Sequence, residues 1–281
     1  SALARLLSEH GYDFLGAASR STESAESACE FAGTGTAHPE APPLTRRADL
    51  VFLTVPDDAI EEVCARIAGD DGFAAGSVVA HCSGALDSTI LSPASESGAH
   101  VGSMHPLQSF ATTEQALKIL PGSYCCIEGD EGAVDVLREV ASALECPPMT
   151  IPTDGKMLYH AAAVVACNFL VALEDAAVEV DGSAGIGQQQ AIQSLMPLIR
   201  GTVDNLEEVG LPDCLTGPIA RGDVETTRKH LEELERACPD VLPLYRTLAV
   251  RTVDIGLRKG TLAEEKARAL RELLEDDAEA R

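Results

Sequence analysis

Residues 48–56 read ADLVFLTVP, an apolar run of strand length that ends at a proline. A run without polar alternation indicates a strand that is buried on both faces of a sheet. Similar short runs occur at residues 12–18, 76–84, 98–106, 123–129 and 147–152. Helical segments are expected between most of them, at 22–32, 57–67, 88–96, 112–120 and 130–145. This alternation predicts an α/β fold with a doubly wound, mainly parallel sheet.

Two stretches depart from the alternation. Residues 33–44, GTGTAHPEAPPL, are rich in glycine and proline and predict a loop. From Pro152 onward the pattern changes to long helical runs, at 154–180, 185–210, 222–237, 240–258 and 262–276. Pro197 is expected to bend or interrupt the second of these runs. We therefore predict an α/β domain over residues 1–151 and an all-helical domain over residues 152–281.

Composition bears on the class of partner. The formal net charge of −24 repels phosphate backbones, so nucleic acid is not expected as a partner. We find no run that approaches the length of a membrane span and no signal peptide, so neither a membrane nor export is expected. The nine cysteines are scattered and form no C-x-x-C pair. That pattern disfavours a metal site and indicates reduced thiols in a cytoplasmic protein.

The first predicted strand is followed at once by Ser19, Arg20, Ser21 and Thr22. In a dinucleotide-binding sheet this position lies beside the adenosine ribose, where an acidic residue indicates NAD and an arginine suits the 2′-phosphate of NADP. Here hydroxyl groups flank a guanidinium, whose fork matches a phosphate. The four residues are therefore candidates for binding NADP, with NAD disfavoured. They can also be read as an ordinary helix start, with Thr22 or Ser21 as the N-cap.

A dinucleotide site also requires a glycine-rich turn, G-x-G-x-x-G, between a first strand and a first helix. The chain opens with SALARLL, which reads as that first helix. We expect the strand and its glycines to precede Ser1. Without them, the pyrophosphate would lack the helix-end amides that normally bind it.

The strand at 48–56 ends with candidate cofactor contacts. Thr54, Val55 and Pro56 follow its apolar core and are expected to pass beneath the nicotinamide side of the cofactor. The next strand ends in HCSGAL (81–86), from which we assign Ser83 to the cofactor as well. The same residues also read as a strand end and a helix start.

The strand at 98–106 ends in SMHPLQSF (103–110). His105 is a catalytic candidate because the following proline holds its backbone extended, which suits a fixed polar group that faces a ligand. Gln108 is a candidate for binding the substrate. A histidine at a strand end is also common as a structural residue, and both interpretations stay open here.

The helical run from residue 154 carries Lys156, His160 and Asn168, which share one broad face of a continuous helix. Alanines lie between them, so another backbone can approach closely. A lysine or histidine in this position can donate a proton to the oxygen that forms when a hydride reaches a carbonyl. All three are therefore catalytic candidates. The alternative is a lysine in solvent and a histidine bonded within the fold.

Residues 215–230, LTGPIARGDVETTRKH, form a polar turn that enters a helix capped by Asp223. Thr216 and Arg221 in this turn are candidates for binding the carboxylate of a substrate. The alternative interpretation is a helix–helix loop with a good cap.

Five segments together carry a resemblance to a known family: ADLVFLTVPDDAI, HCSGAL, VGSMHPLQSF, GKMLYHAAAVVACNFLVAL and LTGPIARGDV. They resemble bacterial Rossmann-like oxidoreductases that carry a C-terminal domain of unknown function. More distantly, they are similar to pyrroline-5-carboxylate reductase, ketopantoate reductase and 6-phosphogluconate dehydrogenase. The resemblance implies an NADP-binding domain and a helical domain that forms a homodimer. It also implies that Lys156 and Asn168 act on the substrate oxygen.

The function expected from these features is that of an NADP-dependent oxidoreductase. It would transfer a hydride between the nicotinamide and a small carbonyl, imine or hydroxy-acid substrate held between the domains. The alternative is a protein that binds NADP without catalysis, as a sensor or a scaffold, and a third possibility is a chain that has lost cofactor binding. The sequence does not identify the substrate or the pathway.

Overall fold

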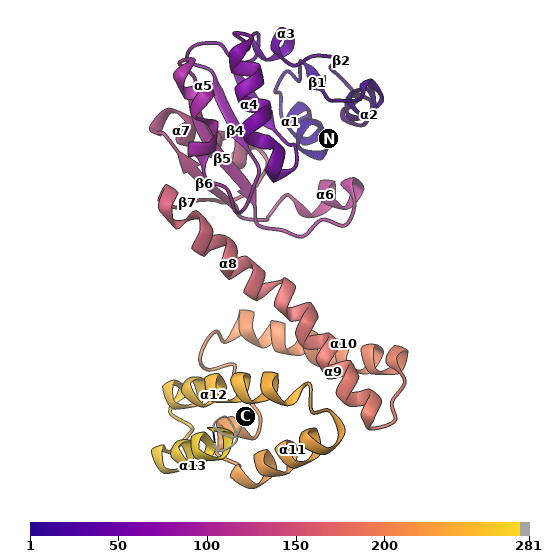
Figure 1. Cartoon of the computed structure of the whole chain (residues 1–281), viewed down its shortest axis with the longest axis vertical. Coiled ribbons are helices and arrows are strands. Elements are labelled where there is room, and N and C mark those ends of the chain that lie inside the picture. Colours follow the sequence, from indigo (N-terminus) through magenta and orange to yellow (C-terminus); the bar gives the residue numbers. More distant parts are fainter. Residues whose placement is uncertain (276–281) are drawn as a thin grey trace. The chain divides into compact units, whose positions relative to one another are not determined.

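The computed structural model describes residues 1–275 and separates the chain into two compact units. The first unit, Ser1–Ala166, contains the strands, and the second unit, which begins at Cys167, is helical (Figure 1). This agrees with the predicted α/β domain followed by a helical domain. Helix α8 (Lys156–Ala166) follows the last strand and belongs to the first unit by its contacts.

The sheet of the first unit is in two parts. Strands β1 (Gly16–Ala18) and β2 (Thr36–His38) pair in parallel with each other. The larger part has the order β3-β4-β5-β6-β7, and only its β5–β6 pair is antiparallel. Its strands are β3 (Leu50–Leu53), β4 (Val78–His81), β5 (His100–Pro106), β6 (Cys125–Gly129) and β7 (Pro148–Thr150). The predicted mainly parallel sheet is confirmed.

The loop predicted over residues 33–44 is wrong, because this stretch contains β2 and the short helix α3 (Pro42–Thr45). Strand β2 forms by pairing with β1, and Gly16 permits the close approach. A Cβ on Gly16 would stand 2.0 Å from the carbonyl oxygen of Thr36. A three-residue strand made by such a contact leaves no periodic signal in its own sequence.

The other helices of the first unit are α1 (Ala2–Glu9), α2 (Thr22–Ala32), α4 (Ile60–Gly69), α5 (Ser92–Glu96), α6 (Thr113–Ile119) and α7 (Glu131–Ala143). Single turns occur at η1 (Asp57–Ala59), η2 (Ser88–Leu91) and η3 (Thr153–Gly155). The second unit has α9 (Asn168–Ser183), α10 (Gln188–Glu208), η4 (Ile219–Arg221), α11 (Val224–Ala237), α12 (Leu242–Lys259) and α13 (Glu264–Glu275). Pro197 lies within α10, which continues through it.

Helices cover both faces of the larger sheet. Alternate residues of β4 point to opposite faces, so Val78 and Ala80 pack with α1 and α7, while Val79 packs with α4 and α5. All four residues of β4 are buried. A strand buried on both faces reads as a continuous apolar run, which explains why the sequence marks it clearly.

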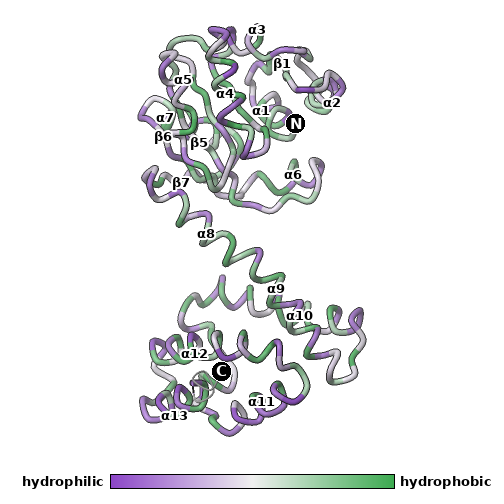
Figure 2. Tube along the Cα trace, in the orientation of Figure 1, coloured by the Kyte–Doolittle hydropathy of each residue, from purple (hydrophilic) through white to green (hydrophobic). Residues whose placement is uncertain are grey.

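The second unit is unevenly packed. Helices α11, α12 and α13 enclose a core that includes Leu231, Val253 and Leu270. In contrast, α9 has no buried residue, and α10 has only Ala191. Apolar residues along α8 and α9 appear in green in Figure 2. The apolar surface of α9 and α10 is therefore left uncovered by the second unit itself.

The segment Thr153–Ser183 has the length and the apolar composition of a membrane-crossing helix, and no part of its most apolar window is buried. The expectation that no run approaches such a length is therefore wrong. The helical run predicted over residues 154–180 is present, with one break at Cys167 that separates α8 from α9.

Candidate active site

Strands β4 and β5 are parallel neighbours, with His81 opposite Ser103. Their carboxyl ends therefore emerge at the same edge of the sheet. The chain leaves β4 into the loop Cys82–Asp87, and β5 ends two residues beyond Met104, at Pro106. This edge is where open α/β sheets bind ligands.

His81 fastens the loop that follows β4. Its ring is fully buried, its Nδ1 accepts a hydrogen bond from the Ser83 amide at 3.2 Å, and its Nε2 lies 3.2 Å from the carbonyl oxygen of Asp87. A carbonyl can only accept, so the ring proton is on Nε2 and the imidazole is neutral. Burial lowers the pKa of His81, in agreement with this form. His81 therefore bonds both ends of the loop and leaves no nitrogen for a ligand.

Ser83 holds the middle of the same loop. Its hydroxyl donates to the carboxylate of Asp57 at 2.7 Å and accepts from the amides of Ala85 and Leu86. Asp57 begins η1, directly after the Thr54–Pro56 turn. The structure thus links two of the predicted cofactor-binding segments through one hydrogen bond. The side chain of Ser83 is buried and fully bonded.

Two imidazoles converge on Gly84. A Cβ on this glycine would stand 2.9 Å from His105 Nε2 and 2.9 Å from His160 Nδ1. No hydrogen bond joins the two rings, and His160 Nδ1 is buried without a partner among the described residues. A buried polar atom without a partner is uncommon in a native protein and calls for an explanation, such as a ligand or an ordered water. We call His105, His160 and Gly84 the two-histidine site.

Tyr159 orients the first of these rings. Its hydroxyl lies 2.9 Å from His105 Nδ1, and the two rings meet edge to face with centroids 5.7 Å apart. Burial, together with the charges of Lys156 and His160, lowers the pKa of His105 to about 4. The imidazole is therefore neutral at pH 7. When Tyr159 donates to Nδ1, the ring proton lies on Nε2, the nitrogen that faces Gly84.

A buried chain of polar groups underlies the site. Lys156 Nζ donates to Ser103 Oγ at 2.6 Å, and Ser103 Oγ donates to Glu128 Oε1 at 2.5 Å. The same carboxylate accepts from the amide of Ser88 at 2.9 Å and from its hydroxyl at 2.8 Å. Lys156 and Glu128 are each only 1% exposed. Burial lowers the pKa of Lys156, and the negative charge of Glu128 opposes that change.

The predicted nucleotide-binding residues lie at the end of β1. Ser21, rather than Thr22, caps α2, since its hydroxyl accepts from the amide of Ser24. Arg20 is exposed, and within the described part of the chain its guanidinium has no hydrogen-bond or ion-pair partner. Ser19 is exposed as well. This end of the strand therefore offers an unpaired cation next to free hydroxyl groups, which suits a phosphate.

Besides Lys156, four residues predicted for catalysis or substrate binding are not part of the two-histidine site as defined here. Asn168, Thr216 and Arg221 belong to the second unit, where all three are exposed, and Arg221 ends η4. Gln108 is exposed at the edge of the first unit, and its side-chain amide is bonded to Ser123 Oγ and to the Ser109 backbone. Their assignment to the substrate or the chemistry stays a prediction.

Several site residues were missed in the sequence. Tyr159 lies between the candidates Lys156 and His160 in the sequence. Only its contact with His105 shows that it belongs to the site. Glu128 carried the clearest available signal, because it is a carboxylate within the apolar strand CCIEG. Among residues 1–275, no group of three or more His, Cys, Asp or Glu side chains could hold a metal ion.

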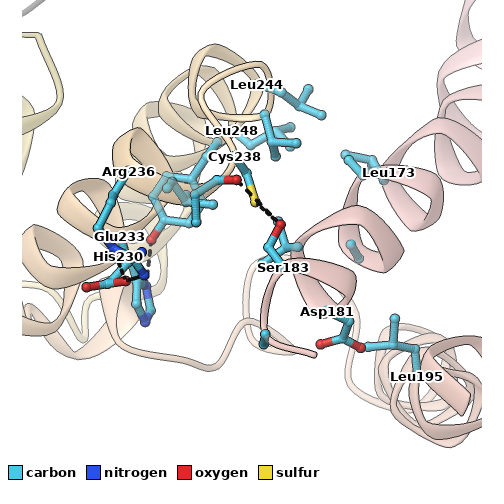
Figure 3. A pocket seen from close by; sticks show the side chains of 18 residues that line it. Leu173, Asp181, Ser183, Leu195, His230, Glu233, Arg236, Cys238, Leu244 and Leu248 are labelled. Carbon is cyan, nitrogen blue, oxygen red and sulfur yellow. Dashed lines mark hydrogen bonds and ion pairs between the residues drawn. The ribbon is translucent and has the colours of Figure 1, made fainter. Parts of the chain in front are cut away.

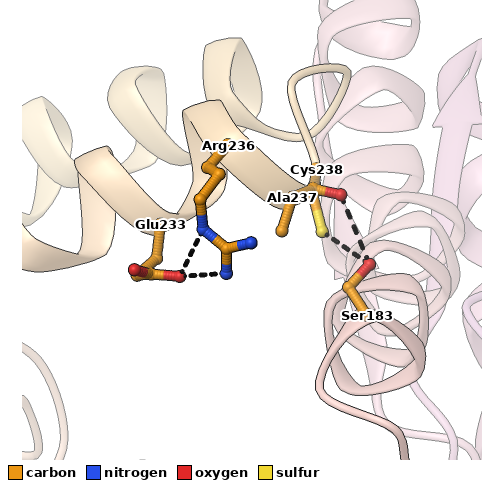
Figure 4. A network of polar contacts seen from close by, with 5 residues as sticks. All are labelled: Ser183, Glu233, Arg236, Ala237 and Cys238. Atoms are coloured by element: carbon orange, nitrogen blue, oxygen red, sulfur yellow. Dashed lines mark hydrogen bonds and ion pairs between the residues drawn. The ribbon is translucent and has the colours of Figure 1, made fainter.

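A cavity of about 540 Å³ lies within the second unit between α9, α11 and α12 (Figure 3). Most of its polar side chains bond to one another. His230 Nδ1 lies 2.9 Å from the hydroxyl of Tyr245, and Arg236 is paired with Glu233. Figure 4 shows how Ser183 bonds to Cys238 and to the Ala237 carbonyl, which fastens α9 to the end of α11. The rest of the lining is mainly apolar, and among the described residues none of its polar atoms is both buried and unpartnered as His160 Nδ1 is.

Two family models match the chain. Residues 1–106 match the model of a Rossmann-like domain, and residues 123–252 match the model of a domain of unknown function, DUF2520. The chain is thus similar to a Rossmann-like domain in its first part and to a domain of unknown function in its second part. A search of the curated proteins finds no match.

Solved structures show the same fold over most of the chain. Protein TM1727 from Thermotoga maritima is 27% identical, with a TM-score of 0.72 over 92% of this chain and 97% of that one. A 1-pyrroline-5-carboxylate reductase from Streptococcus pyogenes is 15% identical, with a TM-score of 0.60 over 92% and 93%. A reductive aminase from Aspergillus terreus, solved in complex with NADPH and ethyl levulinate, is 17% identical, with a TM-score of 0.60 over 99% and 89%. These two structures share the fold of this chain.

Proposed function

We propose that the chain is an NADP-dependent oxidoreductase that reduces a small carbonyl or imine compound, or oxidises the corresponding hydroxy acid or amine. One observation carries the proposal: two imidazole nitrogens converge on Gly84 at the ligand-binding edge of the sheet, and one of them is buried without a partner. A substrate oxygen or nitrogen would satisfy it. Similarity in fold to an NADPH-bound reductive aminase supports the cofactor.

The nucleotide would bind along the first unit. Arg20, with the hydroxyls of Ser19, Ser21 and Thr22, would hold the 2′-phosphate, and the turn Thr54–Pro56 would lie along the nicotinamide ribose. The unpaired guanidinium of Arg20 fits this role. When bound, NADPH would supply the hydride. Binding of a cofactor that carries the extra phosphate is expected because no acidic side chain occupies residues 19–22.

The two histidines would bind and polarise the substrate atom. His105 is neutral at pH 7 and, with Tyr159 donating to Nδ1, presents an N–H toward Gly84. A fixed donor aimed at the atom where negative charge develops stabilises the transition state. His160 supplies the second nitrogen. Asn168, Gln108, Thr216 and Arg221 stay in the proposal as groups that contact the substrate.

The test is a search for turnover that depends on His160. The full-length chain would be mixed with NADPH and a panel of small ketones, imines and keto acids, with absorbance followed at the nicotinamide band. We expect turnover by the wild type and a loss of about 100-fold in His160→Ala, within the usual range for a group that acts on the proton of the reaction. The matched control is His10→Ala, because His10 is exposed in α1's C-terminal turn. Equal turnover in the wild type and His160→Ala would refute the proposal.

A second candidate function is a sensor that binds NADP without catalysis. The observation that favours it is the burial of Lys156, which removes the one lysine near the site from contact with a ligand. Calorimetric titration with NADPH distinguishes the two functions. Tight binding without turnover across the whole panel would favour the sensor.

We also propose that a second copy of the chain covers α9, α10 and the cavity of the second unit. Val171 on α9 and Leu198 on α10 are 70% and 68% exposed, and neither helix contributes to the core of α11–α13. Exposed apolar side chains that gather on neighbouring helices mark an interaction site. A membrane fits less well, because Lys156 at the start of the apolar segment is fixed inside the first unit by Ser103.

Sedimentation of the full-length chain tests this partner. We expect a dimer that Val171→Asp converts to a monomer, whereas Tyr124→Asp, at an exposed residue of the first unit, leaves it unchanged. A wild-type monomer that co-sediments with phosphatidylcholine vesicles would contradict the proposal. All nine cysteines are free thiols, which agrees with the proposed cytoplasmic location.

A further inference from the structure

The carboxylate of Glu128 joins the three segments that build the two-histidine site. It accepts from Ser88, which directly follows the loop that contains Gly84, and from Ser103, which lies two residues before His105 on β5. Through Ser103 it is linked to Lys156, which opens the helix that carries Tyr159 and His160. Loop, strand and helix thus meet at one side chain that is itself only 1% exposed.

The residues that bond to Glu128 directly or through Ser103 lie on the same faces of their strand and helix as the residues of the site. Ser103 and His105 are two residues apart on a strand, so their side chains leave it on the same face. Lys156, Tyr159 and His160 are three and four residues apart on a helix and also share a face. A shift of Ser103 or Lys156 would therefore shift both imidazoles relative to Gly84.

The buried chain also brings a charge close to His105. An ammonium group near an imidazole disfavours a second positive charge. The titratable groups that surround His105 are Lys156, Tyr159 and His160 on α8, Asp57 on η1 and Cys126, its register partner on β6. Among them Lys156 has the largest effect on the charge of the ring, and it opposes protonation. Asp57 acts in the opposite sense.

We propose that Glu128 is the positioning residue of the two-histidine site: through Ser88, Ser103 and Lys156 it holds loop, strand and helix in one register, and the Lys156 ammonium adds to burial in disfavouring a charge on His105. In this proposal Glu128 and Lys156 act through the residues to which they bond rather than on the substrate itself. This inference rests on the proposed function only in its kinetic readout, because the ionisation of His105 can be measured without turnover.

The first experiment titrates the histidine rings of the full-length chain by NMR. In Lys156→Met we expect the pKa of His105 to rise by about 1, since a neighbouring charge commonly contributes that much. The control Lys118→Met removes an exposed ammonium of the same unit and should leave the pKa unchanged. Lys156→Met leaves Glu128 without its cation, so the double variant Lys156→Met/Glu128→Gln, which buries no unpaired charge, provides the same test if the single variant does not fold. An unchanged pKa of His105 in the folded variant would overturn the inference.

The second experiment uses Glu128→Gln, with Glu114→Gln on the exposed face of α6 as the control. We expect the ring signals of both His105 and His160 to shift in Glu128→Gln and neither to shift in Glu114→Gln. We also expect Glu128→Gln to lower kcat about 10-fold and to leave the Kd of NADPH unchanged. Ring signals identical to the wild type would overturn the positioning role. If the wild type turns over no substrate in the panel, the proposed function fails, while the ring signals still decide this inference.

Discussion

The hydroxyl of Tyr159 lies 2.9 Å from Nδ1 of His105, and this contact determines which nitrogen of the ring can face a ligand. In Tyr159→Phe the imidazole loses its partner, so either tautomer becomes available. One hydrogen bond of this kind contributes about 0.5–1.5 kcal/mol to the free energy of unfolding, and we expect a loss of that size there; a similar loss in the transition state would lower kcat by up to roughly 10-fold. Steady-state kinetics and thermal unfolding measure the two effects. Tyr124→Phe, at an exposed tyrosine, is the control, and a Tyr159→Phe variant with wild-type kcat would contradict this role.

Gly84 leaves the space into which both imidazoles point. In Gly84→Ala the new methyl group would stand 2.9 Å from each of two ring nitrogens, so at least one ring must move. We expect a cost of about 1–3 kcal/mol in the free energy of unfolding, together with a large loss of turnover. The control is Gly69→Ala at the end of α4, where an added Cβ meets no atom within 4 Å. Wild-type turnover in Gly84→Ala would show that no substrate enters between the rings.

Arg20 is expected to discriminate between the two nicotinamide cofactors. Loss of a charged hydrogen bond costs about 1.5–3 kcal/mol, so Arg20→Ala should weaken NADPH binding by roughly 10- to 100-fold and leave NADH binding nearly unchanged. Fluorescence titration with each cofactor measures this difference. Arg66→Ala, at an exposed arginine of α4, is the control. An equal loss of affinity for both cofactors would contradict the assignment of Arg20 to the 2′-phosphate.

The lowered pKa of His105 makes the stability of the first unit depend on pH. The folded ring has a pKa of about 4, whereas the unfolded ring has one near 6.5. Between these values the unfolded chain binds more protons, so the free energy of unfolding decreases as pH falls from 6.5 to 4. The contribution of this ring is at most about 3 kcal/mol.

Urea unfolding of the wild type and His105→Gln across this pH range isolates the contribution. The wild type should lose more stability than the variant, and His10→Gln at an exposed histidine should behave as the wild type does. Parallel curves for the wild type and His105→Gln would show that the ring protonates equally in both states.

The sequence allowed the larger sheet to be predicted because β3 to β6 are buried enough to read as apolar runs. It could not indicate β2, since three residues that pair with β1 need a partner strand rather than a pattern of their own. His105, Lys156 and His160 were identified from strand ends and helix spacing, and the structure places them in one unit. Whether Lys156 contacts solvent or Ser103 depends on how α8 packs against β5. The spacing of residues along a helix does not indicate that packing.

The same limit explains the missed residues of the site. Gly84 and Tyr159 matter because of what lies across from them in space, and neither has a chemical type that demands a ligand. Glu128 could have been noticed, because a carboxylate in a buried strand must find donors. Its donors, Ser88 and Ser103, are 40 and 25 residues away along the chain, so no local pattern connects them.

The small β1–β2 pair has a consequence for how the molecule moves. Two strands of three residues, none of them buried, form a ribbon that contributes little stability by itself. Amide protons of Ala17 and Ala37 should therefore exchange with deuterated water much faster than those of Val79 and Ala80 on β4, through local opening that leaves the rest of the unit folded. The β1–β2 pair, beside the residues that would bind the nucleotide, would then be the strand pair of the first unit that opens most readily. Binding of the nucleotide would slow the exchange of these amide protons.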